Sequence, residues 1–239
     1  MRLDKFLSNM NIGSRSDVKK LIKQKVVKLN NKVITNGKIQ LDPAKEQVSL
    51  NNKIITYEPY KYLMLNKPQG VISATTDPSQ KTVLDLIAPE DQIKNLAPIG
   101  RLDKNTTGLL LLTNNGTLTH QLLAPQKHIA KTYSALISGI PTTKIIRLFK
   151  NGIDLKDGTQ CKPALLKIIK SDPLKNRSQI QITITEGKYH QVKRMFAACN
   201  MKVLTLKRLS MGTLKLDPHL KEGNYRALTT TEKNDLLKK

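Results

Sequence analysis

Apolar residues at helical spacing open the chain in two short stretches. The first is Leu3, Phe6, Leu7 and Met10, and the second is Val18, Leu21 and Ile22. Both follow the spacing of an amphipathic α-helix, and segment 14–17, Ser-Arg-Ser-Asp, has the composition of a helix N-terminus. Residues 26–34 then alternate about an Asn-Asn pair. The pattern predicts two packed helices followed by a small β-hairpin.

Beyond residue 61 the pattern favours strands. Apolar runs predict strands at 62–65, 109–112 and 203–204, and alternation predicts others at 133–137 and 180–184. A helix is expected around 145–149, ending near Gly152, and another at 189–199. The apolar stripe of that second helix is expected to be Tyr189, Val192, Phe196 and Cys199.

These patterns divide the chain of 239 residues into two domains. We expect a small helix-helix-hairpin module at residues 1–56, a linker at 57–61 (Tyr-Glu-Pro-Tyr-Lys), and a larger domain at 62–239. The larger domain mixes helices with strands in a mainly antiparallel sheet. The fold class is therefore predicted to be α+β.

The charge of the chain favours a polyanionic partner. It carries 41 Lys and Arg against 18 Asp and Glu, a net charge of +23. Nucleic acid is the leading candidate. An anionic membrane is the alternative, but no apolar run approaches the roughly 20 residues of a spanning helix. The opening residues lack the apolar stretch of a signal peptide, so we expect a cytoplasmic protein with no membrane contact.

Composition also argues against metal and cofactor sites. Cys161 and Cys199 are far apart and have no Cys or His companion at ligand spacing, so neither a disulfide framework nor a zinc site is expected. No glycine-rich nucleotide-binding loop is present. We therefore expect no metal and no cofactor.

Basic residues cluster on the second predicted helix. The first sixty residues hold 12 Lys and Arg against 5 Asp and Glu, and the candidates for contact with phosphate are Arg15, Lys19, Lys20 and Lys23. A charge run of this kind is also common on a merely solvated face. The order of helices and hairpin over residues 1–50 resembles the alpha-L RNA-binding motif, which is also found in a small-subunit ribosomal protein. This resemblance favours the RNA-binding interpretation.

A single acid, Asp103, precedes the four-leucine run at 109–112. Residues 100–116 read Gly-Arg-Leu-Asp-Lys-Asn-Thr-Thr-Gly-Leu-Leu-Leu-Leu-Thr-Asn-Asn-Gly, so a loop leads into a buried strand and a turn follows at 115–116. Asp is common in turns, and a structural role is the alternative for Asp103. The stretch resembles the catalytic motif of bacterial RNA pseudouridine synthases, in which this aspartate is the nucleophile.

Two further segments resemble motifs of the same family. Residues 131–133, Lys-Thr-Tyr, imply that Tyr133 packs against the target base, although a tyrosine in a strand commonly fills a core. Residues 186–195, Glu-Gly-Lys-Tyr-His-Gln-Val-Lys-Arg-Met, imply that Lys193 pairs with Asp103 and favours its ionised form. Many relatives have Arg at that position, which can pair through two nitrogens.

The resemblance implies a cofactor-free isomerisation. The base is detached from the ribose, rotated and rejoined through C5, after being flipped into a pocket with Arg101 filling the gap. Arg194 could contact phosphate or only solvent. His190 is assigned a hydrogen-bonding role at a helix start. His120, His128 and His219 have no partner by spacing.

The substrate implied is ribosomal RNA. Segment 64–70, the Tyr-His-Gln-Val-Lys of 189–193 and the opening six residues resemble most the branch of the family acting on one uridine of 16S rRNA. Relatives acting on large-subunit RNA usually read Asn-Arg at 189–190. We expect a monomer acting on 16S rRNA in a partly assembled small subunit. The alternatives are a large-subunit enzyme and a ribosome-associated RNA-binding protein without chemistry.

Overall fold

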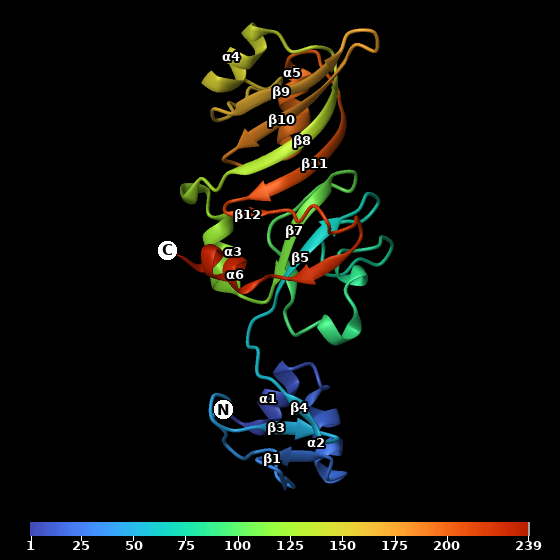
Figure 1. Cartoon of the computed structure of the whole chain (residues 1–239), viewed down its shortest axis with the longest axis vertical. Coiled ribbons are helices and arrows are strands. Elements are labelled where there is room, and N and C mark those ends of the chain that lie inside the picture. Colours follow the sequence, from blue (N-terminus) through green and yellow to red (C-terminus); the bar gives the residue numbers. More distant parts are fainter. Residues whose placement is uncertain (239) are drawn as a thin grey trace. The chain divides into compact units, whose positions relative to one another are not determined.

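The computed structural model describes residues 1–238, and their contacts define two compact units (Figure 1). The first unit is Met1–Lys61 together with Ile87–Leu96. The second comprises Tyr62–Leu86 and the residues from Ala97 onward. Each unit combines helices with a sheet and has its own hydrophobic core, which confirms the α+β class.

The N-terminal unit packs two helices against a four-stranded sheet of order β2-β1-β3-β4. Its elements are α1 (Leu3–Asn9), α2 (Arg15–Lys23), β1 (Val27–Leu29), β2 (Lys32–Val33), β3 (Val48–Leu50) and β4 (Lys53–Ile55). The predicted hairpin is confirmed, because β1 and β2 pair antiparallel on either side of Asn30 and Asn31. Both asparagines have positive φ, a conformation that Asn tolerates better than most residues.

Helix α2 begins at the expected place. The Ser14 side chain accepts a hydrogen bond from the Asp17 backbone N at 3.3 Å, and Asp17 Oδ2 accepts one from the Ser14 backbone N at 3.2 Å. Such a capping box contributes about 1 kcal/mol to a helix. Val18 and Ile22 are buried on one face of α2, which leaves its lysines on the solvent side.

The segment expected to be a linker makes contacts within the N-terminal unit. The ring of Tyr57 stacks on that of Phe6 with 5.2 Å between centroids, and Lys61 forms an ion pair with Asp91. Asn11 Nδ2 also donates a hydrogen bond to the Pro89 carbonyl at 3.3 Å. Residues 87–96 therefore belong structurally with the first unit, although they lie beyond residue 61 in the sequence.

The second unit is built on a nine-stranded sheet of order β13-β5-β7-β11-β8-β10-β9, with β6 paired to β7 and β12 to β11. The strands are β5 (Tyr62–Lys67), β6 (Ala97–Pro98), β7 (Thr107–Thr113), β8 (Lys131–Ser138), β9 (Leu165–Asp172), β10 (Arg177–Ile184), β11 (Val203–Met211), β12 (Leu214–Lys215) and β13 (Tyr225–Ala227). The sheet is mainly antiparallel as predicted. In the described chain, the parallel pair is β7 with β11.

The parallel pair joins two parts of the sheet through a short seam. Thr107 pairs with Lys207 and Gly108 with Arg208. Gly108 has φ +98°, and a Cβ at this position would lie 2.3 Å from the Arg208 carbonyl oxygen. Glycine is therefore required where these two strands meet.

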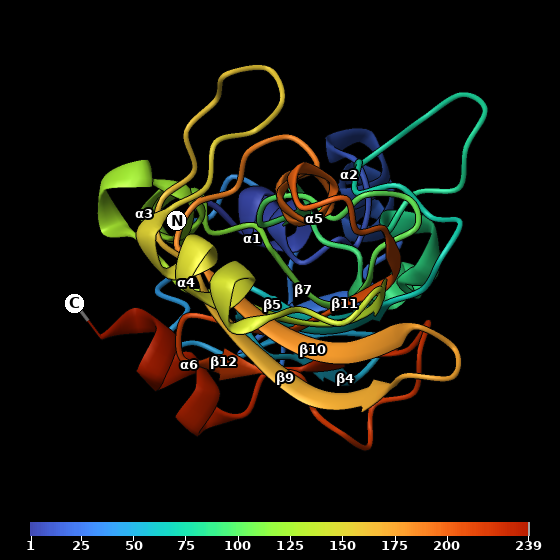
Figure 2. The same cartoon turned by 90° about the horizontal axis from the view of Figure 1, so that it is seen from above.

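The helices of the second unit are α3 (Gly116–Leu123), α4 (Thr143–Asn151), α5 (Gln191–Ala198) and α6 (Thr230–Leu237). Single turns of 3-10 helix are η1 (Leu84–Leu86) and η3 (Pro125–Lys127), and η2 (Pro89–Asp91) lies in the first unit. Helix α4 ends at Gly152 as expected. Helices α4 and α5 lie on the same face of β8–β11, with the Phe149 and Phe196 rings 4.9 Å apart (Figure 2).

Two local predictions are corrected by the structure. Asn115 and Gly116 begin helix α3 rather than a turn, because the Asn115 side chain accepts a hydrogen bond from the Leu118 backbone N at 3.1 Å and caps the helix. Tyr189 precedes α5 and is 73% exposed, so it is not part of the apolar stripe of that helix. Val192 and Phe196 of the predicted stripe are buried.

Strands β5 and β7 form the buried centre of the second unit. Every residue of both strands is buried, which confirms the strand predicted at 109–112. The core on one face contains Tyr62, Met64, Ile99, Leu109, Leu111, Leu118, Leu122, Met211, Leu214, Leu228 and Leu236. The chain before β7 is therefore anchored on a rigid scaffold.

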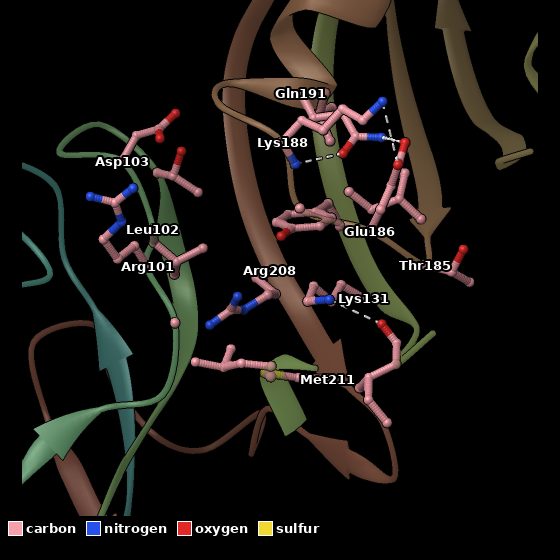
Figure 3. Close-up of a pocket in the computed structure, with 18 of the residues that line it drawn as sticks. Arg101, Leu102, Asp103, Lys131, Thr185, Glu186, Lys188, Gln191, Arg208 and Met211 are labelled. Atoms are coloured by element: carbon pink, nitrogen blue, oxygen red, sulfur yellow. Dashed lines mark hydrogen bonds and ion pairs between the residues drawn. The ribbon is translucent and has the colours of Figure 1, made fainter. Parts of the chain in front are cut away.

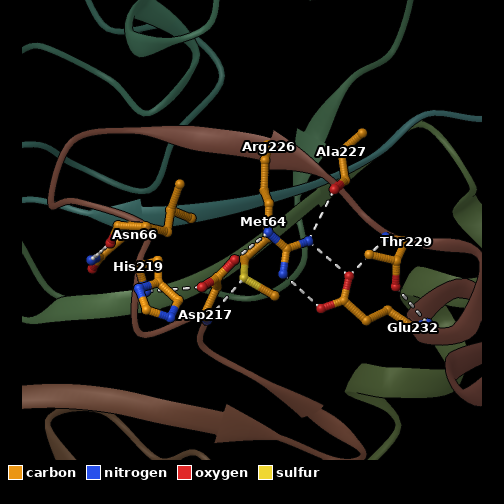
Figure 4. Close-up of polar contacts among 9 residues, drawn as sticks. Met64, Asn66, Asp217, His219, Arg226, Ala227, Thr229 and Glu232 are labelled. Atoms are coloured by element: carbon orange, nitrogen blue, oxygen red, sulfur yellow. Dashed lines mark hydrogen bonds and ion pairs between the residues drawn. The ribbon is translucent and has the colours of Figure 1, made fainter.

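A polar network attaches the C-terminal elements to this scaffold (Figure 4). Arg226 on β13 donates from Nε to Asp217 Oδ2 at 2.7 Å and from both terminal nitrogens to the Glu232 carboxylate at 2.8 Å. These hydrogen bonds lower the pKa of Glu232, which also caps α6 through Thr229. The network is structural, since each of its charges is paired within it.

Candidate active site

The loop that carries Asp103 connects β6 to β7 and is held from several sides. The Thr106 backbone N donates to the Asp103 carbonyl at 3.0 Å. The Ser73 hydroxyl donates to the Leu102 carbonyl at 2.9 Å and accepts from the Leu102 backbone N at 3.0 Å. These contacts fix the backbone on both sides of the Asp103 carboxylate.

Lys67, the last residue of β5, is buried beneath this loop. Its Nζ lies 3.0–3.3 Å from four carbonyl oxygens, those of Pro68, Asp103, Lys104 and Thr106. Burial lowers the pKa of Lys67 to about 8, and the carboxylates of Asp103 and Glu222 oppose this shift. The ammonium therefore replaces water as the hydrogen-bond donor to the loop.

Two side chains approach the Asp103 carboxylate, one at each oxygen. Lys193 Nζ donates to Oδ2 at 2.7 Å, and His190 Nε2 lies 3.5 Å from Oδ1. The Asp103 side chain is 29% exposed, so it remains accessible to a ligand. The Lys193 ammonium therefore supplies the positive charge in direct contact with this carboxylate.

The segment before α5 delivers His190 and Lys193 to Asp103. The Gln191 side chain accepts from the Lys188 backbone N at 2.9 Å and donates to Glu186 Oε1 at 2.6 Å. His190 adopts a left-handed conformation with φ 47°, and its ring stacks on that of Tyr189. His190 is the N-cap residue of α5 as expected, but its side chain makes no capping hydrogen bond, so the hydrogen-bonding role expected for it there is wrong.

A cavity of about 320 Å³ lies beside Asp103 (Figure 3). It is lined by residues of the Asp103 loop, of β8 and β11, and of the segment before α5. Tyr133, on β8, lines it and is 8% exposed, whereas Arg101 lines it with an exposed side chain. The structure thus brings Asp103, Lys193, Tyr133 and Arg101 to one cavity.

The remaining candidate residues lie away from the carboxylate. Arg194 forms an ion pair with Asp157 and donates to the Tyr189 carbonyl at 3.3 Å, so its guanidinium is already engaged. The four basic candidates of the N-terminal unit are exposed on α2, and Lys20 Nζ lies 3.7 Å from Asp17. They are Arg15, Lys19, Lys20 and Lys23.

Sequence patterns did not identify two buried cations near the site, Lys67 and Arg208. Arg208 lines the cavity from β11, is 2% exposed, and donates from Nε to the Leu109 carbonyl at 2.7 Å. In both cases the signal in the sequence was a basic residue within or at the end of an apolar strand. That signal was not enough to predict burial, because Lys and Arg are usually exposed.

The cavity favours anionic or polar ligands over metals. Its lining contains more cations than carboxylates. Among residues 1–238, no group of three or more His, Cys, Asp or Glu side chains could hold a metal ion.

The described helices are all too short or too polar to span a membrane. Both cysteines are unpaired thiols, and burial raises the pKa of Cys161 and of Cys199.

Two family models match the chain. Residues 61–198 match the RNA pseudouridylate synthase family, and residues 1–48 match the S4 domain. A solved structure described as a pseudouridylate synthase superposes with a TM-score of 0.67 at 34% identity, covering 99% of this chain and 100% of that one.

Curated relatives of similar length carry related names. An uncharacterized RNA pseudouridine synthase of Bacillus subtilis is 45% identical over 97% of this chain and 96% of its own. A ribosomal small subunit pseudouridine synthase A of Yersinia pestis is 38% identical over 97% and 96%. A ribosomal large subunit pseudouridine synthase B of Bacillus subtilis is 39% identical over 97% and 93%.

Proposed function

The chain belongs to the RNA pseudouridine synthase family and is an RNA-modifying isomerase, and from this premise we propose that it converts one uridine of 16S rRNA into pseudouridine with Asp103 as the reacting carboxylate. The contact between Lys193 Nζ and Asp103 Oδ2 at 2.7 Å, beside the cavity, is the observation that carries the assignment of Asp103. It joins groups 90 residues apart in the sequence.

The site residues fit the steps of this isomerisation. Asp103 either attacks C1′ or removes the proton at C2′, and in both cases the N1–C1′ bond breaks with its electron pair going to uracil. The free base then rotates and C5 bonds to C1′, as Asp103 leaves C1′ on the first route or returns the proton to C2′ on the second. The proton on C5 is then lost while N1 gains one. Lys193 holds the Asp103 carboxylate through its hydrogen bond, Tyr133 offers a ring for stacking on the base, and Arg101 occupies the space that the flipped nucleotide leaves.

Small-subunit rRNA is the substrate that we favour. The relative from Yersinia pestis named for the small subunit aligns over nearly the whole chain. His190 Nε2 lies 3.5 Å from Asp103 Oδ1, and the Tyr189 ring stacks on that of His190. We propose uridine 516 of 16S rRNA as the target, as the resemblance of these segments implies. Large-subunit rRNA is the second candidate, because the relative named for that subunit is similar to an equal degree.

The N-terminal unit is proposed to hold the RNA. It matches the S4 domain, and its four basic candidates on α2 are exposed. Phosphate contacts by such residues would position the RNA without reading its sequence. We propose that the protein acts in the cytoplasm as a monomer on a partly assembled small subunit, where the target uridine is still accessible.

The test is to map pseudouridine in rRNA from cells lacking this protein and from cells complemented with the wild type or Asp103→Asn. Loss of a single pseudouridine from 16S rRNA, restored by the wild type and not by the variant, is expected. Purified Asp103→Asn should still bind the RNA within a few fold, because the amide preserves size and hydrogen bonding. A missing site in large-subunit rRNA would overturn the substrate, and turnover by the variant would overturn the role of Asp103.

A further inference from the structure

An unpaired cation is buried in the wall of the active-site cavity. The Arg208 side chain is 2% exposed, and its Nη2 has no hydrogen-bond partner. Within residues 1–238 no ion pair joins Arg208 to a carboxylate. A buried charge without a counter-charge is costly, so its presence beside a cavity indicates that the ligand supplies the negative charge.

The register of the sheet places Arg208 beside the base-stacking residue. Arg208 on β11 lies directly opposite Tyr133 on β8, and directly opposed residues share a face of the sheet. Lys131 lies two residues before Tyr133 and therefore shares that face as well. All three line the cavity, and Figure 3 shows Arg208 and Lys131 across from the loop that carries Arg101 and Asp103.

Lys131 strengthens the positive field at this wall. Its Nζ donates to the Ile129 carbonyl at 3.1 Å, and burial together with the nearby Arg208 charge lowers its pKa. Two cations thus lie on the side of the cavity that Tyr133 occupies, while the carboxylate of Asp103 is held by Lys193 on another segment. The cavity therefore separates the group that reacts with the ribose from the groups that face the base.

We propose that Arg208, supported by Lys131, stabilises the negative charge that uracil acquires when its bond to the ribose breaks. On either route open to Asp103, the electron pair of the N1–C1′ bond moves to the ring and spreads over N1, O2 and O4. A guanidinium beside Tyr133 interacts more strongly with this anion than with neutral uridine, which lowers the barrier to cleavage. The charge disappears when C5 forms its bond to C1′, and transfer of the C5 proton to N1 then restores the conjugated ring. The inference rests on the isomerase activity and not on the choice of rRNA.

The experiment compares natural uridine with 5-fluorouridine in Arg208→Gln. Fluorine at C5 withdraws electrons and stabilises the uracil anion, so the fluorinated base depends less on the protein for this purpose. Transcripts of small- and large-subunit rRNA are made with either nucleotide, and the transcript that the wild type modifies is used. Cleavage of the N1–C1′ bond is followed under single turnover by nuclease digestion and mass spectrometry of the rearranged nucleosides.

We expect Arg208→Gln to slow uridine cleavage by about 10²–10³-fold, the usual effect of removing one donor to a developing anion. The loss on 5-fluorouridine RNA should be at least about tenfold smaller, with RNA affinity unchanged within about threefold. Arg208→Lys should recover part of the rate, because it retains the charge. Arg147→Gln, an exposed residue of α4, is the matched control and should behave as wild type.

Three results would overturn the proposal. Equal losses on the two RNAs would mean that Arg208 positions the sheet or substrate without stabilising the anion. Weakened RNA binding with an unchanged single-turnover rate would mean that the buried guanidinium contacts a phosphate. If Arg208→Gln fails to give a cooperative thermal transition, the same comparison is made with Lys131→Met, and equal losses there would refute the role of this wall. Modification of the large-subunit transcript alone would overturn the 16S substrate but leave this comparison intact.

Discussion

Replacing Lys67 by Met is expected to loosen the loop that carries Asp103. The Lys67 ammonium is buried and contacts four carbonyl oxygens at 3.0–3.3 Å. Methionine has a similar length but donates no hydrogen bond. An ammonium has three N–H groups, and at a net of about 1 kcal/mol each their loss should lower the free energy of unfolding by about 3 kcal/mol. The rate of modification should fall with it, because Asp103 and Lys104 belong to the released loop.

The effect of this substitution should depend on pH. Burial lowers the pKa of Lys67 from 10.5 to about 8, so between these values the unfolded chain holds more protons at this residue than the folded chain. The free energy of unfolding of the wild type therefore rises with pH in that window. Below about pH 8, Lys67 is protonated in both states and adds no pH dependence. From pH 7 to pH 9.5 the rise is about 2 kcal/mol, at roughly 1.36 kcal/mol per pKa unit. The difference between wild type and Lys67→Met should widen by that amount.

Urea unfolding at both pH values measures the two quantities, provided that the slopes of the transitions agree. Lys104→Met is the matched control, since Lys104 lies in the same loop but is exposed. In the described residues, its side chain donates one hydrogen bond, to Gln80 Oε1. It should change the free energy of unfolding by less than about 0.5 kcal/mol. The reasoning would be refuted if Lys67→Met matched this control at pH 7, or if its deficit did not grow at pH 9.5.

Three further outcomes are expected. Lys193→Met should lower the single-turnover rate by about 10²-fold through loss of the cation beside Asp103. Lys193→Arg should retain most of the rate. A fully active Lys193→Met would remove the pairing from the mechanism. Gly108→Ala should destabilise the second unit by about 3 kcal/mol, because its Cβ would meet the Arg208 carbonyl at 2.3 Å, and an unchanged melting temperature would contradict the close approach. Neutralising the basic residues of α2 should reduce the slope of log affinity against log salt by about 3, at roughly 0.7–0.9 per phosphate contact, and an unchanged slope would mean that these charges are only solvated. The residues to replace by Gln are Arg15, Lys19, Lys20 and Lys23.

Local sequence patterns predicted the elements whose burial follows a single period. The helices around Phe6 and Val18, the hairpin at Asn30, and the strand at 109–112 all have one apolar face or a continuous apolar run. Asn115-Gly116 was ambiguous, because Asn favours both turns and helix N-caps, and the Leu118 backbone N decides between them only in the folded chain. Tyr189 matched the helical period by coincidence, since its helix begins two residues later.

The candidate site was predictable only in part. Family motifs led to Asp103, Tyr133 and Lys193, and their roles remain predictions. Lys67 could not be identified, because its burial depends on carbonyl groups 36 to 39 residues away in the sequence. Arg208 is buried by long-range pairing with β7 and β8, which a single strand does not reveal.

The pairing of β7 with β11 has a consequence for synthesis of the protein. Asp103 emerges from the ribosome about a hundred residues before Arg208, the residue that closes the seam at Gly108. At about 5–20 residues per second, translation leaves β7 without this neighbour for roughly 5–20 s. The first unit needs no residue beyond Leu96, so it can fold during that interval. With the roles that we propose for the two units, a nascent chain would hold RNA before it can modify it.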